Sequence, residues 1–375
     1  MTYDALKELS ERGVSLYLDD ISRSRLDSGD LRRLIEDRHV VGVTTNPSIF
    51  KKALDDGEGY DNTLRMLARS GFSTADALRV LTCMDVRDAA DLLAPIHQAT
   101  SGHDGWVSLE VNPFYADDTD ATVAEASLLH WMVGRQNVMM KVPATDAGLP
   151  AVTELVSRGI PVNVTVIFSL DRYRKAAEAY MAGLERAAAE GRDLTAIRSV
   201  ASFYLARLDD AIDGELDTVG TPEADALRGR IALSHAHLAQ ETHTELHSGS
   251  RWKALAREHP GLSPQRLLWA STATKDERYS DTRYVTDLAL RGSINTMPEK
   301  TLQAVADHGT VPGEPLGTEV PDARAAVRGL DMIGISFENV ADRLEEEAVT
   351  GFEDAWQEIQ EVLRTRMQPT GEEDD

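Results

Sequence analysis

The sequence predicts an α/β fold, a closed (β/α)8 barrel formed as a single domain with additional C-terminal helices. Short apolar or β-branched runs recur between amphipathic helical stretches, which is the pattern of repeated βα units. Eight such runs occur along the chain, the number that a closed parallel barrel needs. An open, doubly wound sheet is the alternative. It would normally carry a glycine-rich phosphate turn after an early strand, and the sequence has none.

The expected elements alternate in the order that a barrel requires. A helix is predicted over 170–190, because Ser169 is an N-cap candidate and the segment is rich in alanine. Another is predicted over 224–247, and a short one over 297–309, with a proline in its first turn and a glycine at its end. The expected strands span 14–18, 40–44, 106–111, 137–142, 161–168, 198–204, 267–272 and 292–296.

The domain prediction follows from this order of elements. Residues 1–310 are expected to form the catalytic barrel. Residues 311–368 are expected to form helices packed on the outside of the barrel, and residues 369–375 an acidic tail that frays.

The composition excludes several classes of protein. A single cysteine, Cys83, rules out an internal disulfide and a thiolate metal cluster. A net charge of -24 argues against nucleic-acid binding, because a polyanion would be repelled. No apolar run is long enough to span a bilayer, and the N-terminus has no apolar signal core. We therefore expect a cytoplasmic protein with no membrane partner.

Lys141 is the one lysine that falls inside an expected strand, NVMMKV. Burial of an ammonium is costly and lowers its pKa, so we expect a neutral amine here. Such an amine can attack a ketone and form a Schiff base. The alternative is a strand-end lysine that reaches solvent or pairs with Glu110.

Polar residues stand at or near the carboxyl ends of seven expected strands, where their neighbours are apolar. In a barrel these ends converge on one face, which is where catalytic groups are found in such folds. One polar strand end is ordinary, but seven together predict a site. The residues are Asp19, Asn46, Glu110, Lys141, Asn163, Thr165, Ser202 and Ser271.

Segments along most of the expected barrel resemble the transaldolase family, in its longer actinobacterial form. The most diagnostic are TTNPS and the lysine strand NVMMKVPAT; LYLDDISR, VSLEVNP, PVNVTVIFS, VASFYLAR, LLWASTATKD and SINTMPEKTL also match, in the family's order. The resemblance implies a TIM barrel enzyme of the non-oxidative pentose phosphate pathway. Such an enzyme moves a dihydroxyacetone unit from sedoheptulose 7-phosphate or fructose 6-phosphate to an aldose phosphate. The implied partners are sugar phosphates, the implied state is a monomer or homodimer, and no cofactor or metal is implied.

The resemblance also implies a role for each catalytic residue. Lys141 would form the Schiff base, and Glu110 would act through a water that Thr165 also holds. Asp19 would be the acid/base at the C4 hydroxyl of the substrate. Imine formation and C–C cleavage need proton transfers at different places, so two carboxylates suit two steps. Asp20 is the competing assignment for Asp19, because strand alternation leaves the register ambiguous.

Substrate-binding residues are implied in the same way. Asn46 and Ser202 match residues that hold hydroxyls of the dihydroxyacetone unit, with Asn163 beside the lysine. Arg207 matches the family's phosphate-binding arginine, and Ser271 the serine after the seventh strand. Each strand-end group could instead be satisfied by the backbone alone.

The sequence departs from many transaldolases at two places. Ala273 stands where a second phosphate-binding arginine is common, and Lys275, two positions on, is expected to supply that charge as a point donor; a solvated surface lysine is the alternative. Tyr204 replaces a phenylalanine and resembles the related fructose-6-phosphate aldolase branch, whereas Glu110 is of the transaldolase type. The combination of an aldolase-type Tyr204 with a transaldolase-type Glu110 predicts a transaldolase with some aldolase side activity.

Other functions are less well supported. His235, His237, His243 and His247 fall in one expected helix, and the last two, in HTELH, have the i, i+4 spacing of a zinc site, but no third ligand is evident. A fructose-6-phosphate aldolase that releases free dihydroxyacetone is the nearest alternative. A catalytically silent barrel used as a binding module would be expected to lack Lys141 or a carboxylate. A metal-dependent aldolase or isomerase would need a ligand set that the sequence does not offer.

Overall fold

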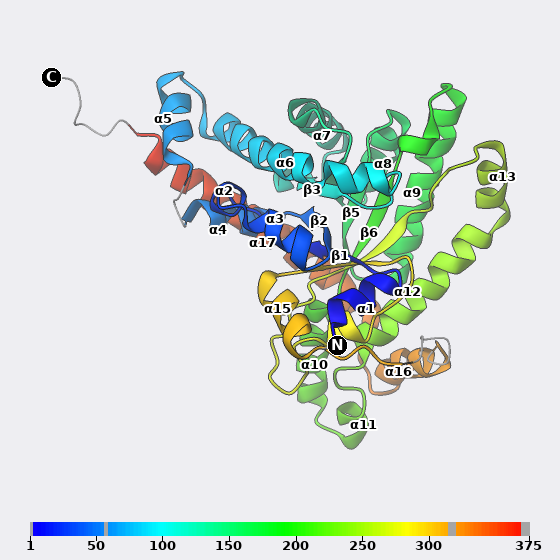
Figure 1. Ribbon diagram of the computed structural model, residues 1–375. Helices are drawn as coiled ribbons and strands as arrows, with labels where there is room; N and C mark the ends of the chain where they lie inside the picture. The colour runs from blue at the N-terminus through cyan, green and yellow to red at the C-terminus, as the bar shows by residue number, and fades with distance from the viewer. Residues whose placement is uncertain (1–2, 56–58, 314–319, 369–375) are drawn as a thin grey trace.

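The computed structural model describes residues 3–55, 59–313 and 320–368, so the acidic tail at 369–375 lies outside the described residues. Parallel strands form a closed barrel in which each strand pairs with the next and β8 returns to β1. Helices lie around this barrel (Figure 1). The predicted fold class is confirmed, and each predicted strand is present within two residues of its expected ends. The strands are β1 (Ser15–Leu18), β2 (Val40–Thr44), β3 (Trp106–Glu110), β4 (Val138–Pro143), β5 (Val162–Ile167), β6 (Ser199–Tyr204), β7 (Arg266–Ala270) and β8 (Ile294–Met297).

Helices surround the barrel in the order expected of βα units. The helices are α1 (Ala5–Glu11), α2 (Arg23–Asp27), α3 (Asp30–Asp37), α4 (Pro47–Asp55), α5 (Asp61–Arg69), α6 (Thr74–Ala99), η1 (Pro113–Tyr115), α7 (Thr119–Val133), α8 (Gly148–Ser157), α9 (Leu170–Ala189), η2 (Leu194–Ala196), α10 (Ala206–Val219), α11 (Pro222–Asp225), α12 (Ile231–Ser248), α13 (Ser250–Glu258), α14 (Arg283–Thr286), α15 (Glu299–His308), α16 (Val320–Met332) and α17 (Phe337–Arg366).

Two of the three predicted helices are confirmed and one begins later than expected. Helix α9 starts after Ser169, whose hydroxyl accepts the backbone N–H of Arg172 at 3.1 Å, and α15 stops at its glycine. The helix predicted over 224–247 begins at Ile231, because Gly229 interrupts the chain with φ +63°. Asp213 fixes this turn by accepting the backbone N–H of Gly229 at 2.9 Å.

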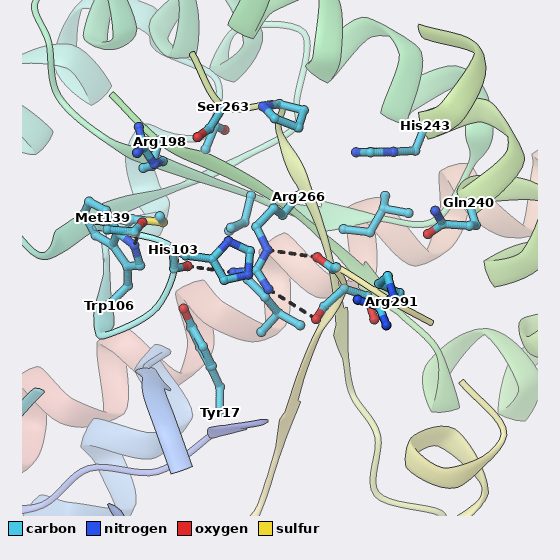
Figure 2. A pocket seen from close by; sticks show the side chains of 18 residues that line it. Tyr17, His103, Trp106, Met139, Arg198, Gln240, His243, Ser263, Arg266 and Arg291 are labelled. Carbon is cyan, nitrogen blue, oxygen red and sulfur yellow. Dashed lines mark hydrogen bonds between the residues drawn. The ribbon is translucent and has the colours of Figure 1, made fainter. Parts of the chain in front are cut away.

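Arg266 closes the amino end of the barrel. Its guanidinium donates to the carbonyl oxygens of Gly292 at 2.9 Å and His103 at 2.7 Å, and to the hydroxyl of Ser15 at 2.6 Å. Figure 2 shows the guanidinium between these segments, beside a cavity of about 170 Å³. Because the partners precede β1, β3 and β8 or lie at their starts, Arg266 holds the amino ends of these strands together.

The barrel interior above Arg266 is filled by the ring of Tyr17, which is 2% exposed. Gly42 on the neighbouring strand β2 makes room for this ring, since a Cβ added there would lie 2.3 Å from the Cζ of Tyr17. The ring of Tyr17 therefore fills the interior next to the amino-end cavity, which it lines, and it does not line the pocket at the carboxyl ends of the strands.

The two C-terminal helices occupy different places. Helix α16 packs against α12, whereas α17 contacts β5, α10, α6, α4 and α5 and so crosses the carboxyl end of the barrel. Arg343 in its first half pairs with Glu215 of α10 at 2.9 Å, and Glu358 in its second half pairs with Lys51 of α4 at 2.8 Å. Both helices thus pack on the barrel, α16 against its outer helices and α17 across its carboxyl end.

Candidate active site

A pocket of about 180 Å³ opens at the carboxyl ends of the strands, at the opposite end of the barrel from Arg266. Its walls come from β1, β2, β4, β6, β7 and β8, from the loops that follow them, and from α17. Barrels of this type hold their catalytic groups at this end. The lining residues are Asp19, Thr44, Asn46, Ser48, Lys141, Ser202, Tyr204, Arg207, Leu268, Ala270, Ser271, Thr296 and Phe352.

Lys141 and Glu110 form a buried ion pair beneath the pocket. They are register partners on β4 and β3, so both side chains point into the barrel side by side. The Nζ of Lys141 lies 3.0 Å from Oε2 of Glu110 and donates also to the carbonyl oxygen of Thr45 at 3.0 Å. The two side chains are each 5% exposed. The lysine does not reach out to bulk solvent, which removes one alternative from the sequence analysis; its pairing with Glu110 is observed.

The protonation of this pair differs from the sequence expectation. Burial lowers the pKa of Lys141, but the carboxylates of Glu110 and Asp19 outweigh burial, and the pKa is raised above its usual value. The direction of the shift is therefore opposite to the lowered pKa that burial alone predicts for Lys141. Burial raises the pKa of Glu110, and Lys141 offsets only part of that rise. The pair thus holds a proton that can pass from the lysine to the carboxylate.

Asp19 lies in the pocket, at the end of β1. The hydroxyl of Thr44 donates to its Oδ1 at 2.6 Å and is itself 2.6 Å from the hydroxyl of Thr296. Burial raises the pKa of Asp19, while Lys141 and the hydrogen bond from Thr44 lower it less. A carboxyl group whose pKa is raised in this way can more readily accept a proton and return it.

Asp20, the competing candidate, faces away from the pocket. Its carboxylate pairs with Arg25 of α2 at 3.0 Å, and the same guanidinium pairs with Glu299 at 2.6 Å. The strand register is therefore settled in favour of Asp19 as the residue that lines the pocket.

Thr165 and Tyr204 meet through their hydroxyl oxygens, which are 3.1 Å apart. Burial raises the pKa of Tyr204, so its hydroxyl is protonated. Val166 follows Thr165 with φ +62°, a conformation that β-branched residues rarely adopt, and the pairing of β5 with β6 shifts register between Val164 and Ile167. This bulge directs Thr165 toward Tyr204.

The polar groups expected to bind the substrate's hydroxyls lie at two depths. Ser202 lines the pocket and donates to Oδ1 of Asn163 at 2.6 Å, while the amide nitrogen of Asn163 donates to Ser108 at 3.0 Å. Asn163 is fully buried and lies beneath the lining, so it orients Ser202. Asn46 lines the pocket, and its Oδ1 accepts the backbone N–H of Ile49 at 3.0 Å. That bond leaves the amide N–H groups of Asn46 available.

The cationic side of the pocket is formed by Arg207, in the first turn of α10, beside Ser271. Ser271 has φ +52°, so the chain turns sharply after β7. A helix N-terminus and a guanidinium together suit an anion such as phosphate. Lys275 does not join them, since its side chain is 70% exposed and its ammonium pairs with Asp210 at 3.2 Å. The structure thus favours a surface position for Lys275.

Several lining residues carried no signal that sequence reasoning could use. Thr45 contributes a main-chain carbonyl, which any residue could supply. Ser48 and Thr296 are small hydroxyl residues of common type. Phe352 comes from α17, far along the chain, and only the fold brings its ring to 5.8 Å from the Nζ of Lys141. Thr44 could have been found, because it stands in TTNPS beside the recognised Asn46.

The histidine-rich helix shows no metal-binding arrangement. The rings of His243 and His247 stack with centroids 4.2 Å apart, and burial lowers the pKa of His243 to about 4. His235 lies between Phe203 and Phe337 in the core. In the described ranges, no group of three or more histidine, cysteine, aspartate or glutamate side chains could hold a metal ion. Nor does any helix there have the length and apolarity needed to cross a membrane.

Comparison with known proteins agrees with the geometry. Residues 16–363 match a family model described as Transaldolase/Fructose-6-phosphate aldolase, a match that includes most of α17. The chain is 51% identical over 370 residues to Transaldolase 1 of Streptomyces avermitilis, covering 99% of this chain and 97% of the relative. It is 51% identical over 354 residues to the transaldolase of Thermobifida fusca, covering 94% and 96%. This chain therefore belongs to the transaldolase and fructose-6-phosphate aldolase family.

Proposed function

We propose that this chain is a transaldolase that carries a dihydroxyacetone unit on Lys141, from sedoheptulose 7-phosphate or fructose 6-phosphate to an aldose phosphate such as glyceraldehyde 3-phosphate. The observation that carries the proposal is the buried Lys141–Glu110 pair, 3.0 Å apart, in a pocket that also holds Asp19 and Arg207. A lysine nucleophile, two carboxyl groups and a cation are the parts that the reaction needs.

The first step would be addition of Lys141 to the ketone. The ammonium must lose a proton before its nitrogen can attack, and Glu110 can take that proton because burial raises the pKa of its carboxyl group. The protonated Glu110 can then return the proton to the carbinolamine oxygen, which leaves as water. Thr165, fixed by the bulge in β5, would share with Glu110 the water that relays these protons.

The second step would be cleavage of the C3–C4 bond. Asp19 would remove the proton of the C4 hydroxyl, and the electron pair of the broken bond would move into the iminium held on Lys141. The resulting enamine attacks the aldehyde of the acceptor, and Asp19 returns its proton to the new hydroxyl. Thr44 fixes the position of Asp19 through its 2.6 Å hydrogen bond.

The polar walls would position the substrate. Asn46 and Ser202 would bind hydroxyls of the dihydroxyacetone unit, with Asn163 orienting Ser202. Arg207 and Ser271 would bind the phosphate group, which is the part of the substrate with most charge. Lys275 has at most a remote electrostatic effect in this proposal, because it is exposed and paired.

The related aldolase reaction is a second candidate at the same site. It is favoured by Tyr204, whose protonated hydroxyl lies 3.1 Å from Thr165 and can supply a proton to the enamine. We propose transfer as the main reaction because Glu110, which is of the transaldolase type, is paired directly with the lysine. We place the enzyme in the cytoplasm, in the non-oxidative pentose phosphate pathway, as a monomer or homodimer that light scattering would distinguish.

The test is borohydride reduction in the presence of fructose 6-phosphate, followed by mapping of the modified peptide. We expect inactivation and a label on Lys141, because the reduced imine is a stable secondary amine. Lys141→Arg is the control and should take no label. A label on Lys275 or Lys300 in the unaltered protein would contradict the proposal. Turnover should also persist in EDTA, and a loss that zinc restores would point to a metal enzyme.

A further inference from the structure

We infer that Phe352 of α17 limits the loss of the bound dihydroxyacetone unit to water, and so sets the ratio of transfer to hydrolysis. The inference rests on the proposed function and extends it, because it assigns the balance between two reactions to a side chain from outside the barrel. The strands of the barrel, the loops after them and the first turns of α4 and α10 supply all the other described residues that line the pocket.

Phe352 covers the lysine. Its side chain is 6% exposed and lines the pocket, and its ring centroid lies 5.8 Å from the Nζ of Lys141. A ring in that place has no hydrogen-bonding group for water, and it occupies volume next to the nitrogen that would carry the substrate. Polar side chains make up most of the remaining wall near the lysine, among them Asp19, Thr44 and Ser202.

The position of Phe352 is fixed by an ion-pair cluster on the same side of α17. Glu345 precedes Phe352 by two helical turns and therefore lies on the same face of the helix. The Nε of Arg172, at the start of α9, lies 3.0 Å from Glu345, and its NH1 atom lies 2.6 Å from Asp146 in the loop after β4. The face that carries Phe352 is thus tied to the loop that follows the strand of Lys141.

The chemistry shows why this cover matters. After C–C cleavage the nitrogen of Lys141 carries an enamine, which has two fates. In transfer, its nucleophilic carbon bonds to the aldehyde carbon of the acceptor. In hydrolysis, that carbon takes a proton, water adds to the resulting iminium, and the C–N bond breaks to give free dihydroxyacetone and the lysine amine. Both fates end when one water releases the iminium from Lys141, so they differ only at the carbon, which takes a proton in hydrolysis and an aldehyde in transfer. Water supplies that proton, directly or by way of Tyr204, so a side chain that keeps water from the carbon slows hydrolysis and leaves attack on the aldehyde intact.

The experiment measures both reactions in Phe352→Ala and Phe352→Leu. Dihydroxyacetone release is followed with fructose 6-phosphate alone, and transfer is followed after addition of erythrose 4-phosphate. We expect the ratio of release to transfer to rise on the order of tenfold in Phe352→Ala, because a cavity open to water replaces the ring. Phe352→Leu keeps an apolar side chain and should give a smaller rise.

Phe337→Ala is the matched control. Phe337 begins the same helix and is 7% exposed, but its ring packs on His235, 4.8 Å between centroids, and it does not line the pocket. Its removal should weaken α17 without changing the ratio. An unchanged ratio in both Phe352 variants, or an equal rise in Phe337→Ala, would overturn the inference. Failure of the proposed function is distinct, because it would appear as absence of the Lys141 label in the unaltered protein.

Discussion

Replacing Glu110 with glutamine removes the charged partner of Lys141 and keeps nearly the same shape. The ammonium would then be buried with uncharged acceptors at hydrogen-bonding distance, such as the carbonyl oxygen of Thr45 at 3.0 Å. Burial lowers the pKa of a lysine that has lost its partner. We therefore expect Lys141 to lose its proton in the folded variant and to keep it in the unfolded chain.

The expected loss in the free energy of unfolding equals the free energy needed to remove the proton from Lys141. For a lysine with an ordinary pKa of about 10.4, it amounts to about 4.6 kcal/mol at pH 7. This agrees with the cost of about 3 to 5 kcal/mol for breaking a buried ion pair. The folded variant binds fewer protons than the unfolded chain, so its free energy of unfolding rises with pH. The deficit in the free energy of unfolding, relative to the unaltered protein, should therefore fall to about 2 kcal/mol at pH 9.

Urea unfolding, followed by tryptophan fluorescence at pH 7 and pH 9, measures this difference. Glu125→Gln is the control, because Glu125 is 5% exposed and accepts the Nε of Arg79 at 2.9 Å, away from the pocket. Arginine keeps its proton at both pH values, so the deficit of Glu125→Gln should not shrink. A deficit of Glu110→Gln that is equal at pH 7 and pH 9 would refute the reasoning.

Three further predictions concern the phosphate side, the proton donor and the barrel core. Arg207→Ala should raise KM for fructose 6-phosphate by about 10-fold to 100-fold, since a charged hydrogen bond contributes about 1.5–3 kcal/mol. Lys275→Ala should change the same KM by less than about twofold, as for an exposed ion pair; equal effects would show the phosphate site to be misplaced. Tyr204→Phe should lower acceptor-free release of dihydroxyacetone more than transfer, and an equal fall in both rates would count against its role as donor. Gly42→Ala should reduce the free energy of unfolding by about 1–3 kcal/mol or more through collision with the ring of Tyr17, and unchanged urea unfolding would contradict that packing.

The positions of the strands could be predicted because the barrel buries both faces of each strand, which therefore reads as a short apolar run. Most of the pocket could be predicted for the same reason, since a polar residue at the end of such a run is conspicuous. Lys141 and Glu110 were found in this way, and the structure pairs them at 3.0 Å. Asp19 could be separated from Asp20 only by the family motif, because strand alternation did not fix the register.

Features that depend on distant parts of the chain could not be predicted. The pKa of Lys141 depends on carboxylates from β1 and β3, and the argument from burial alone gave the wrong direction. The late start of α12 depends on Asp213, which accepts the backbone N–H of Gly229 across a turn. Phe352 sits in an ordinary amphipathic helix, and no local pattern indicates that one of its apolar residues faces the pocket.

The place of α17 in the sequence gives the enzyme an order of assembly. The ribosome completes every strand of the barrel before it makes Phe352, which follows β8 by more than fifty residues. The strands that carry Lys141 and Glu110 are therefore complete in the chain before the helix that covers them. A barrel without α17 would leave the nitrogen of Lys141 open on the side where Phe352 lies. The pocket gains this wall only when the last helix docks across the barrel.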